Sequence, residues 1–195
     1  MQTQIPEIHA ALSALGEILE ADEHHVAVVI VGGTALILQG FVSRATQDVD
    51  VIALGSENLP NETQVLKEPE PLPGALTRGI ARVARDFNLP VDWMNTTIGL
   101  QWKTGLPPGL GTRVHWQRLG GLWLGLADRY DLIFLKLYAA ADSQGPSSVH
   151  YQDLLALNPT RKELQAASTW VRSQDPSSGF GQILDEVLEH IQSNG

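Results

Sequence analysis

The sequence predicts an α+β protein in which a mixed α/β sheet with flanking helices is followed by a small helical bundle. An apolar strand, paired glycines, a short helix and a second apolar strand follow one another between Val26 and Leu54. Two apolar-rich runs separated by Gly120-Gly121 have the pattern of a β-hairpin. From Ala127 onward the sequence changes to helical segments. Strands that come first and helices that come last are typical of this fold class.

The length of the chain limits the number of domains. With 195 residues, the chain is long enough for one good core and a small appended domain. We expect the first domain to span residues 1–126 and the helical region to span residues 127–195. Within the helical region, Thr160 and Glu163 have the spacing of a helix capping box.

The other elements of the first domain are predicted from periodicity and composition. Apolar residues recur at helical spacing over residues 5–22, and residues 75–87 have helical character. Residues 89–95, LPVDWMN, have the pattern of a short strand. Residues 55–74 are rich in Pro, Glu and Asn, so we expect a mobile loop or linker there.

The composition is that of a globular protein. Hydrophobic residues make up 43% of the chain and charged residues 18%, which is ordinary for a soluble domain. The chain has no run of about 18 apolar residues, and its N-terminus lacks the basic start and apolar block of a signal peptide. We therefore expect a cytoplasmic location and no membrane partner. The absence of cysteine excludes disulfides, thiol catalysis and cysteine-ligated zinc.

The net charge of −9 is unevenly distributed. Residues 1–75 contain 11 acidic and 2 basic residues, whereas residues 76–195 contain 11 of each. Because phosphate attraction supplies most nonspecific nucleic-acid affinity, this balance argues against a protein that coats long nucleic acid. Local basic clusters could still hold a short or structured RNA.

Asp48 and Asp50 stand two positions apart at the start of the second apolar strand. Side chains alternate along a strand, so both carboxylates are expected to point to the same face. Two neighbouring carboxylates repel each other and lose hydration unless a cation lies between them. A hard, oxygen-seeking ion suits this position, and we expect Mg²⁺ or Mn²⁺.

The first apolar strand ends at Gly32 and Gly33, and a helix begins there. Free backbone N–H groups and the positive end of a helix dipole suit a phosphate group. We therefore predict that Gly32, Gly33 and Thr34 bind the phosphates of a nucleotide. The alternative is that the glycines form only a tight turn and that the two aspartates are solvated surface acids. The glycine pair alone, or the Asp-x-Asp pair alone, would favour this alternative, but the two motifs together in this order do not.

The complete motif is Gly32-Gly33-Thr34 followed by Arg44-x-Thr46-x-Asp48-x-Asp50. It resembles the nucleotidyltransferase superfamily, which has a polymerase-beta-like core, and is most similar to the branch of abortive-infection and type IV toxin-like nucleotidyltransferases. The common form of the family has Gly-Ser after the first strand, whereas this chain has Gly-Gly-Thr. The resemblance implies that the first domain is catalytic, and that Arg44 and Thr46 contribute to nucleotide binding.

The resemblance implies three further site residues. The superfamily supplies one more acid from a neighbouring strand, and Asp92 in the predicted strand 89–95 has the corresponding place in chain order. A solvent-facing acid on an edge strand is the alternative for Asp92. In the toxin-like branch a lysine and an aspartate recur on successive helices, and Lys136 and Asp153 match them by position. Lys136 would then act in catalysis and nucleotide binding, and Asp153 in nucleotide binding.

The basic residues leave alternatives open. Lys136 lies in an apolar stretch, so it faces a cleft or is a surface lysine on an amphipathic helix. Arg44 could neutralise a phosphate or pair with an acid. Arg78, Arg82 and Arg85 share one helix face, which more often indicates a solvated face than a phosphate site. Related sequences often carry basic residues between the lysine and the aspartate. Because this chain lacks them, we expect a different acceptor or weaker binding of the substrate phosphates.

These features predict an enzyme that transfers a nucleoside monophosphate from a nucleoside triphosphate to an acceptor hydroxyl or phosphate. Asp48, Asp50 and Asp92 would hold two magnesium ions. The resemblance implies a toxin-like enzyme that acts on tRNA or on a protein and has an antitoxin partner. A small-molecule acceptor such as an antibiotic is a second possibility, because an acidic cleft favours a cation. The alternative from another class is a nucleotide- or partner-binding module without turnover.

Overall fold

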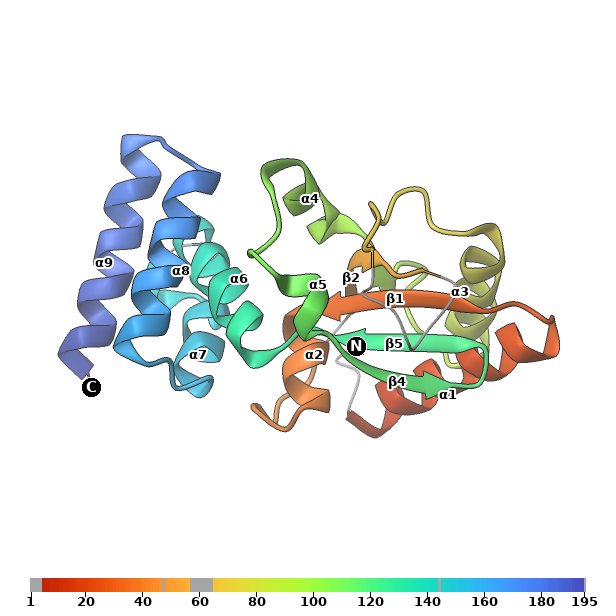
Figure 1. The fold of residues 1–195 in the computed structure, drawn as a ribbon. Helices are drawn as coiled ribbons and strands as arrows, with labels where there is room; N and C mark the ends of the chain where they lie inside the picture. The colour runs from red at the N-terminus through yellow and green to blue at the C-terminus, as the bar shows by residue number, and fades with distance from the viewer. Residues whose placement is uncertain (1–4, 47, 57–64, 144, 195) are drawn as a thin grey trace. The chain divides into compact units, whose positions relative to one another are not determined.

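The computed structural model of the protein describes residues 5–46, 48–56, 65–143 and 145–194 (Figure 1). The chain divides into two compact units, residues 1–127 and residues 128–195. The fold is mixed α+β, as the sequence predicts, with the sheet in the first unit and a helical bundle in the second.

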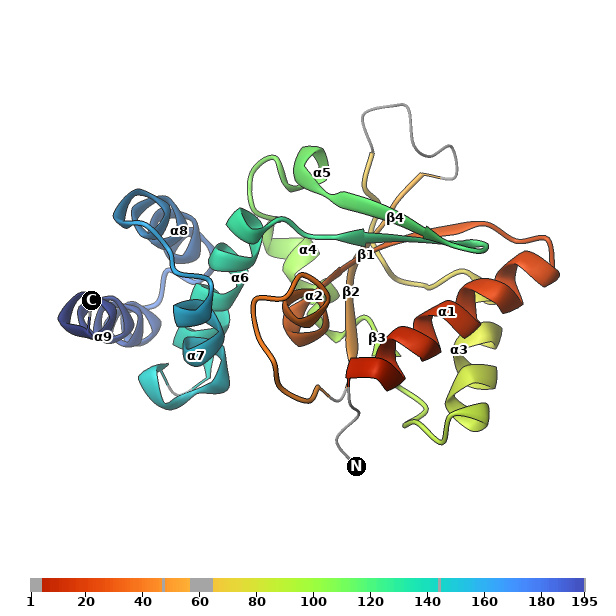
Figure 2. The same ribbon diagram turned by 90° about the horizontal axis from the view of Figure 1, so that it is seen from below.

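In the described residues, the first unit contains a five-stranded mixed sheet in the order β3-β2-β1-β5-β4 (Figures 1 and 2). Its strands are β1 (Val26–Val31), β2 (Val49–Leu54), β3 (Met94–Asn95), β4 (His115–Leu119) and β5 (Leu122–Leu126). β1 lies at the centre, parallel to β5 and antiparallel to β2. β3 is parallel to β2, and β4 forms the predicted hairpin with β5. The strand that leads into Gly32 therefore lies beside the strand that carries Asp50.

The centre of the sheet is apolar on both faces. Every residue of β1, which has a neighbouring strand on each side, is buried. Helix α1 (Ile5–Ala21) contributes Ile8, Leu12, Leu15 and Leu19 to the core, all at most 1% exposed. The helix packs against α3 (Gly74–Asp86) and against the β4–β5 hairpin, and Figure 2 shows α1 and α3 side by side.

Shorter helices complete the first unit. They are α2 (Gly32–Leu38), the 3₁₀ helix η1 (Thr97–Leu100), α4 (Gln101–Thr104) and α5 (Leu110–Arg113). α2 is buried from Gly33 to Ile37 and contacts both β1 and β2. Among the helices in the described ranges, none is both long and apolar enough to cross a membrane.

The predicted strand over residues 89–95 is wrong in its first five residues. The backbone N–H of Leu89 donates to Ala84 at 2.8 Å and closes the end of α3, and the N–H of Trp93 donates back to Pro90 at 3.1 Å. These two bonds turn the chain, so β3 begins only at Met94. Asp92 therefore lies in a turn before the strand and is exposed.

Residues 57–64 of the predicted linker 55–74 lie outside the described ranges, so the prediction is compared with the structure over residues 65–74. Residues 65–73 form neither a helix nor a named strand. Lys67 exchanges two backbone hydrogen bonds with Leu54, at 2.8 and 3.0 Å. This bridge ties the segment to the end of β2.

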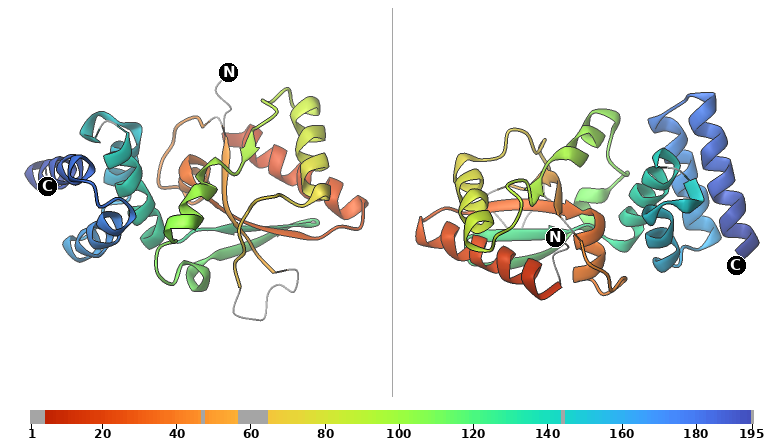
Figure 3. Two further views of the ribbon diagram at one scale, coloured as in Figure 1. Left: turned by 90° about the horizontal axis from the view of Figure 1, so that it is seen from above. Right: turned by 180° about the vertical axis from the view of Figure 1, so that it is seen from behind.

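The second unit is a bundle of helices. In its described residues these are α6 (Arg129–Asp142), α7 (Val149–Ala156), α8 (Arg161–Gln174) and α9 (Ser178–Asn194), with the short 3₁₀ helix η2 (Gly145–Ser147). α6 packs against α7, α8 and α9, as the views in Figures 1 and 3 show. Thr160 and Glu163 form the predicted capping box at the start of α8.

One arginine joins the ends of two helices in this bundle. The guanidinium of Arg129 donates to Glu163 at 2.7 and 3.3 Å, and to the carbonyls of Leu157 and Asn158 at 2.8 Å each. It thereby binds the carbonyl groups at the end of α7 and the capping glutamate of α8. The hydrogen bond from Arg129 is the main reason that the pKa of Glu163 falls from 4.5 to about 2.

Glu163 is expected to make stability depend on pH. Its pKa is lower in the folded protein, so its contribution is complete above pH 4.5 and is lost as the pH falls toward about 2. The free energy of unfolding, measured by urea titration, should fall by about 2 kcal/mol more in wild type than in Glu163→Gln across this window. Asp185→Asn, which breaks the exposed Arg172–Asp185 pair, is the control and should have a much smaller effect. Equal pH dependence in wild type and Glu163→Gln would contradict this assignment.

Candidate functional site

The site begins where β1 ends. Gly32 has a φ of +71°, a left-handed conformation that glycine adopts without strain. A Cβ atom at Gly32 would lie 1.9 Å from Oδ2 of Asp50. The two residues are neighbours because Val31 is in register with Asp50 across the antiparallel β1–β2 pair. The carboxylate of Asp50 therefore packs directly on the backbone of the glycine turn, and only glycine fits there.

The neighbouring glycine is covered by two other residues of the motif. A Cβ atom at Gly33 would lie 2.9 Å from Oγ1 of Thr46 and 3.0 Å from the guanidinium of Arg44. Thr46 is buried, and Arg44 donates to the carbonyl of Ala45 at 3.1 Å. The structure thus brings Gly33, Arg44 and Thr46 together.

Thr34 supports the start of β2. Its side chain is fully buried, and its hydroxyl donates to the backbone carbonyl of Asp48 at 2.6 Å. The hydroxyl is therefore engaged with the backbone that carries one of the two site carboxylates. Thr34 is a positioning residue in this structure, whereas the sequence predicts that it binds phosphate.

Asp48 and Asp50 lie on either side of Val49. Val49 is fully buried and its N–H donates to the carbonyl of Trp93 at 2.7 Å, whereas both aspartates are partly exposed. Asp50 lies within β2 and Asp48 comes immediately before the strand, so strand alternation gives the direction of the Asp50 side chain alone. The arrangement of both carboxylates on one face stays a prediction.

Asp92 does not join this pair. It lies in the turn before β3, and the β3 residue in register with Asp50 is Asn95. Within the described residues there is no group of three or more His, Asp or Glu side chains arranged to hold a metal ion. The position of Asp92 therefore gives no support to its predicted role as a metal ligand.

The oxygen donors present fit one magnesium ion better than two. Mg²⁺ is commonly bound by one or two carboxylates together with substrate phosphates and water. Asp48 and Asp50 match that description, with Gly32 against one of them. The residues that the structure describes do not group a third acid with them, and the number of ions stays a prediction.

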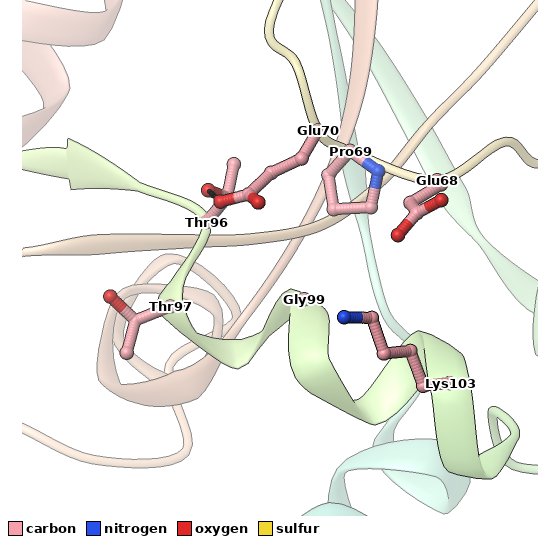
Figure 4. Close-up of a pocket in the computed structure, with 7 residues that line it drawn as sticks. All are labelled: Glu68, Pro69, Glu70, Thr96, Thr97, Gly99 and Lys103. Carbon is pink, nitrogen blue, oxygen red and sulfur yellow. Dashed lines mark hydrogen bonds between the residues drawn. The ribbon is translucent and has the colours of Figure 1, made fainter.

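A cavity of about 240 Å³ is lined in part by Thr96 and Thr97, which directly follow Asn95 in the sequence. Its lining includes Glu68, Glu70, Thr96, Gly99 and Lys103 (Figure 4). The hydroxyl of Thr96 donates to Glu70 at 2.5 Å, and Figure 4 shows Glu68 and Lys103 on the other side of the cavity. Sequence reasoning missed these residues, since Glu68 and Glu70 fall in a segment that reads only as a linker.

The second unit holds the other two predicted residues. Lys136 Nζ donates to Oδ2 of Asp153 at 2.7 Å and lies 3.5 Å from Nδ1 of His150. Lys136 is 5% exposed and Asp153 is 1% exposed, so the surface-lysine alternative is wrong. Lys136 and Asp153 form a buried ion pair between α6 and α7, while their roles in catalysis and nucleotide binding stay predictions.

The glycine turn is expected to be intolerant of a side chain. Gly32→Ala should lower the free energy of unfolding by more than Gly40→Ala, by roughly 1–3 kcal/mol. Both glycines have a positive φ, but a Cβ at Gly40 meets no atom within 4 Å. Urea unfolding of both variants measures the difference. Asp50→Ala should relieve part of the Gly32→Ala penalty in a double-mutant cycle; additive effects would contradict the contact.

The buried hydroxyl of Thr34 can be tested in the same way. Thr34→Val leaves the shape and removes the donor to Asp48, so the free energy of unfolding should fall by about 1–2 kcal/mol. Thr34→Ser keeps the donor and should restore much of this loss. An unchanged free energy of unfolding in Thr34→Val together with a loss in Thr34→Ser, measured by urea unfolding, would show that packing of the methyl group matters and the hydrogen bond does not.

Comparison with known proteins gives one positive finding. Residues 8–104 match the model of a family described as "Nucleotidyltransferase of unknown function (DUF6036)". No curated protein and no solved structure matches the chain significantly. The matched segment contains the glycine turn, both partly exposed aspartates and β3. The match supports placing this segment in the nucleotidyltransferase superfamily.

Proposed function

We propose that the protein is a metal-dependent nucleotidyltransferase that moves a nucleoside monophosphate from a nucleoside triphosphate to an acceptor hydroxyl or phosphate, with pyrophosphate as the leaving group. The main support is Asp50, which packs against Gly32, with Asp48 two residues before it, within the segment that matches a nucleotidyltransferase family. Phosphoryl transfer requires positioning and charge neutralisation more than covalent catalysis. A rigid pair of carboxylates on a buried strand suits that requirement.

The chain's residues divide into those that hold the cation and those that meet the phosphates. Asp48 and Asp50 would hold Mg²⁺ or Mn²⁺, which when bound would neutralise charge on the phosphate oxygens. Gly32 and Gly33 present backbone without side chains, and Arg44 adds a guanidinium beside Gly33. Thr34 and Thr46 are buried and fix the geometry of this segment.

Lys136 and Asp153 are proposed to act in the same reaction, on the basis of the resemblance to the toxin-like branch. Their burial is consistent with a functional role, since a buried ion pair is often no more stabilising than apolar residues of similar volume. A pair kept in an apolar helix core therefore calls for a reason other than stability.

The proposed acceptor is tRNA or a protein, with an antitoxin as a further partner and the cytoplasm as the location. These finer assignments rest on resemblance to the toxin-like branch. The cavity lined by Glu68 and Glu70 favours a second candidate, a small molecule with a positive charge such as an aminoglycoside. Transfer to such a compound, but not to RNA or protein, would identify that candidate.

The position of Asp92 favours one alternative from another class. A nucleotide- or partner-binding module that has lost turnover would not need a third metal acid, and the residues that the structure describes bring none to Asp48 and Asp50. Such a module would bind a nucleoside triphosphate tightly without releasing pyrophosphate.

Asp50→Asn is expected to lower nucleotide transfer by roughly 100-fold or more, because it removes a charge that acts on the reacting phosphates. Transfer is measured with each α-labelled nucleoside triphosphate, magnesium or manganese, and separate pools of tRNA, protein and aminoglycoside. Asp92→Asn is the matched control, and its exposed position predicts nearly wild-type transfer. Nucleotide binding without transfer by wild type would contradict the enzyme proposal and support the binding module.

A further inference from the structure

Resting on the proposed function, we infer that the site takes one divalent cation with the nucleotide, and that Arg44 supplies the fixed positive charge where a second ion would otherwise act. The sequence predicts two ions held by three acids. The register of β2 and β3 and the surroundings of the two glycines point to this different arrangement.

The first observation is the residue that stands beside Asp50. In the parallel pair of β2 and β3, Asp50 is in register with Asn95. Residues in register on adjacent strands point to the same face of a sheet. A third acid from the neighbouring strand would have to stand at this position, and the chain has a neutral amide there.

The amide of Asn95 is moreover engaged with its own flanking backbone. Its Oδ1 accepts from the N–H of Thr97 at 2.9 Å, and its Nδ2 donates to the carbonyl of Asp92 at 3.4 Å. These bonds fold the side chain onto the chain around β3. Asn95 therefore stabilises the turns on both sides of the short strand, and it brings no charge to the site.

A second ion would lack a protein anion of its own. The ions of two-metal sites lie about 3.5–4 Å apart, and Mg²⁺ requires near-octahedral oxygen ligation. Among the described residues no third acid is grouped with Asp48 and Asp50, so a second ion held by these residues would have to share both with the first. One ion, completed by phosphate oxygens and water, satisfies the same two carboxylates fully.

Arg44 and Asp50 both lie against the glycine turn. The Arg44 guanidinium lies against Gly33, while the Asp50 carboxylate lies against Gly32, so the two groups flank adjacent residues. A guanidinium keeps its charge at all ordinary pH values and binds phosphate through two parallel hydrogen bonds. Arg44 is thus suited to neutralise a phosphate without a second metal ion.

The test is a count of bound ions that does not depend on turnover. Full-length protein is titrated with Mn²⁺ in the presence of a non-hydrolysable nucleoside triphosphate analogue, and bound Mn²⁺ is counted by electron paramagnetic resonance. Wild type should bind one Mn²⁺ per chain, Asp92→Asn should also bind one, and Asp50→Asn should bind it at least tenfold more weakly. Asn95→Asp should bind a second ion, because it adds a carboxylate in register with Asp50.

The outcomes separate this inference from the proposed function. Two Mn²⁺ ions on wild type, or loss of an ion in Asp92→Asn, would overturn the one-ion inference while leaving nucleotide transfer possible. A single ion in wild type without any nucleotide transfer would retain the inference and reject the enzyme proposal. Arg44→Gln should weaken binding of the analogue at least tenfold with the ion count unchanged; unchanged affinity would overturn the role of Arg44.

Discussion

The geometry of the candidate site depends on the close contact between Gly32 and Asp50. The Asp50 carboxylate occupies the space that any other residue at position 32 would fill, and Gly32 adopts the left-handed conformation that lets the chain leave β1 at this point. Both facts follow from the antiparallel register in which Val31 faces Asp50. A shift of this register by one residue would turn Asp50 into the core and Val49 out of it. The packing of the sheet centre and the presentation of the site therefore depend on the same pairing.

Buried groups hold the exposed ones in place. Val49 is anchored in the core, Thr34 binds the carbonyl of Asp48, and Thr46 lies buried beside Gly33. The side chains of Asp48 and Asp50 themselves remain partly exposed. Preorganised charges of this kind suit phosphoryl transfer, because the protein does not have to reorganise as charge develops on the phosphate.

The second unit contains two ion pairs, Arg129–Glu163 and Lys136–Asp153, that differ in their burial. Arg129 and Glu163 tie helix ends together near the surface and account for the lowered pKa of Glu163. Lys136 and Asp153 are instead buried in the bundle, where a charge pair costs desolvation on both sides. The first pair has a clear structural purpose, whereas a buried pair such as the second is often no more stabilising than apolar residues of similar volume.

Local sequence determined the fold class, the helices α1 and α3, the β4–β5 hairpin and the capping box of α8. Each of these depends on residues close together in the chain, through periodicity, turn chemistry or capping. Tertiary structure decided that Asn95 and not Asp92 stands beside Asp50, that Thr34 binds the backbone of Asp48, and that Lys136 is buried against Asp153. These outcomes depend on the register between distant strands and on packing between helices. The nearest neighbour of each side chain comes from another part of the chain, so the local sequence pattern does not determine it.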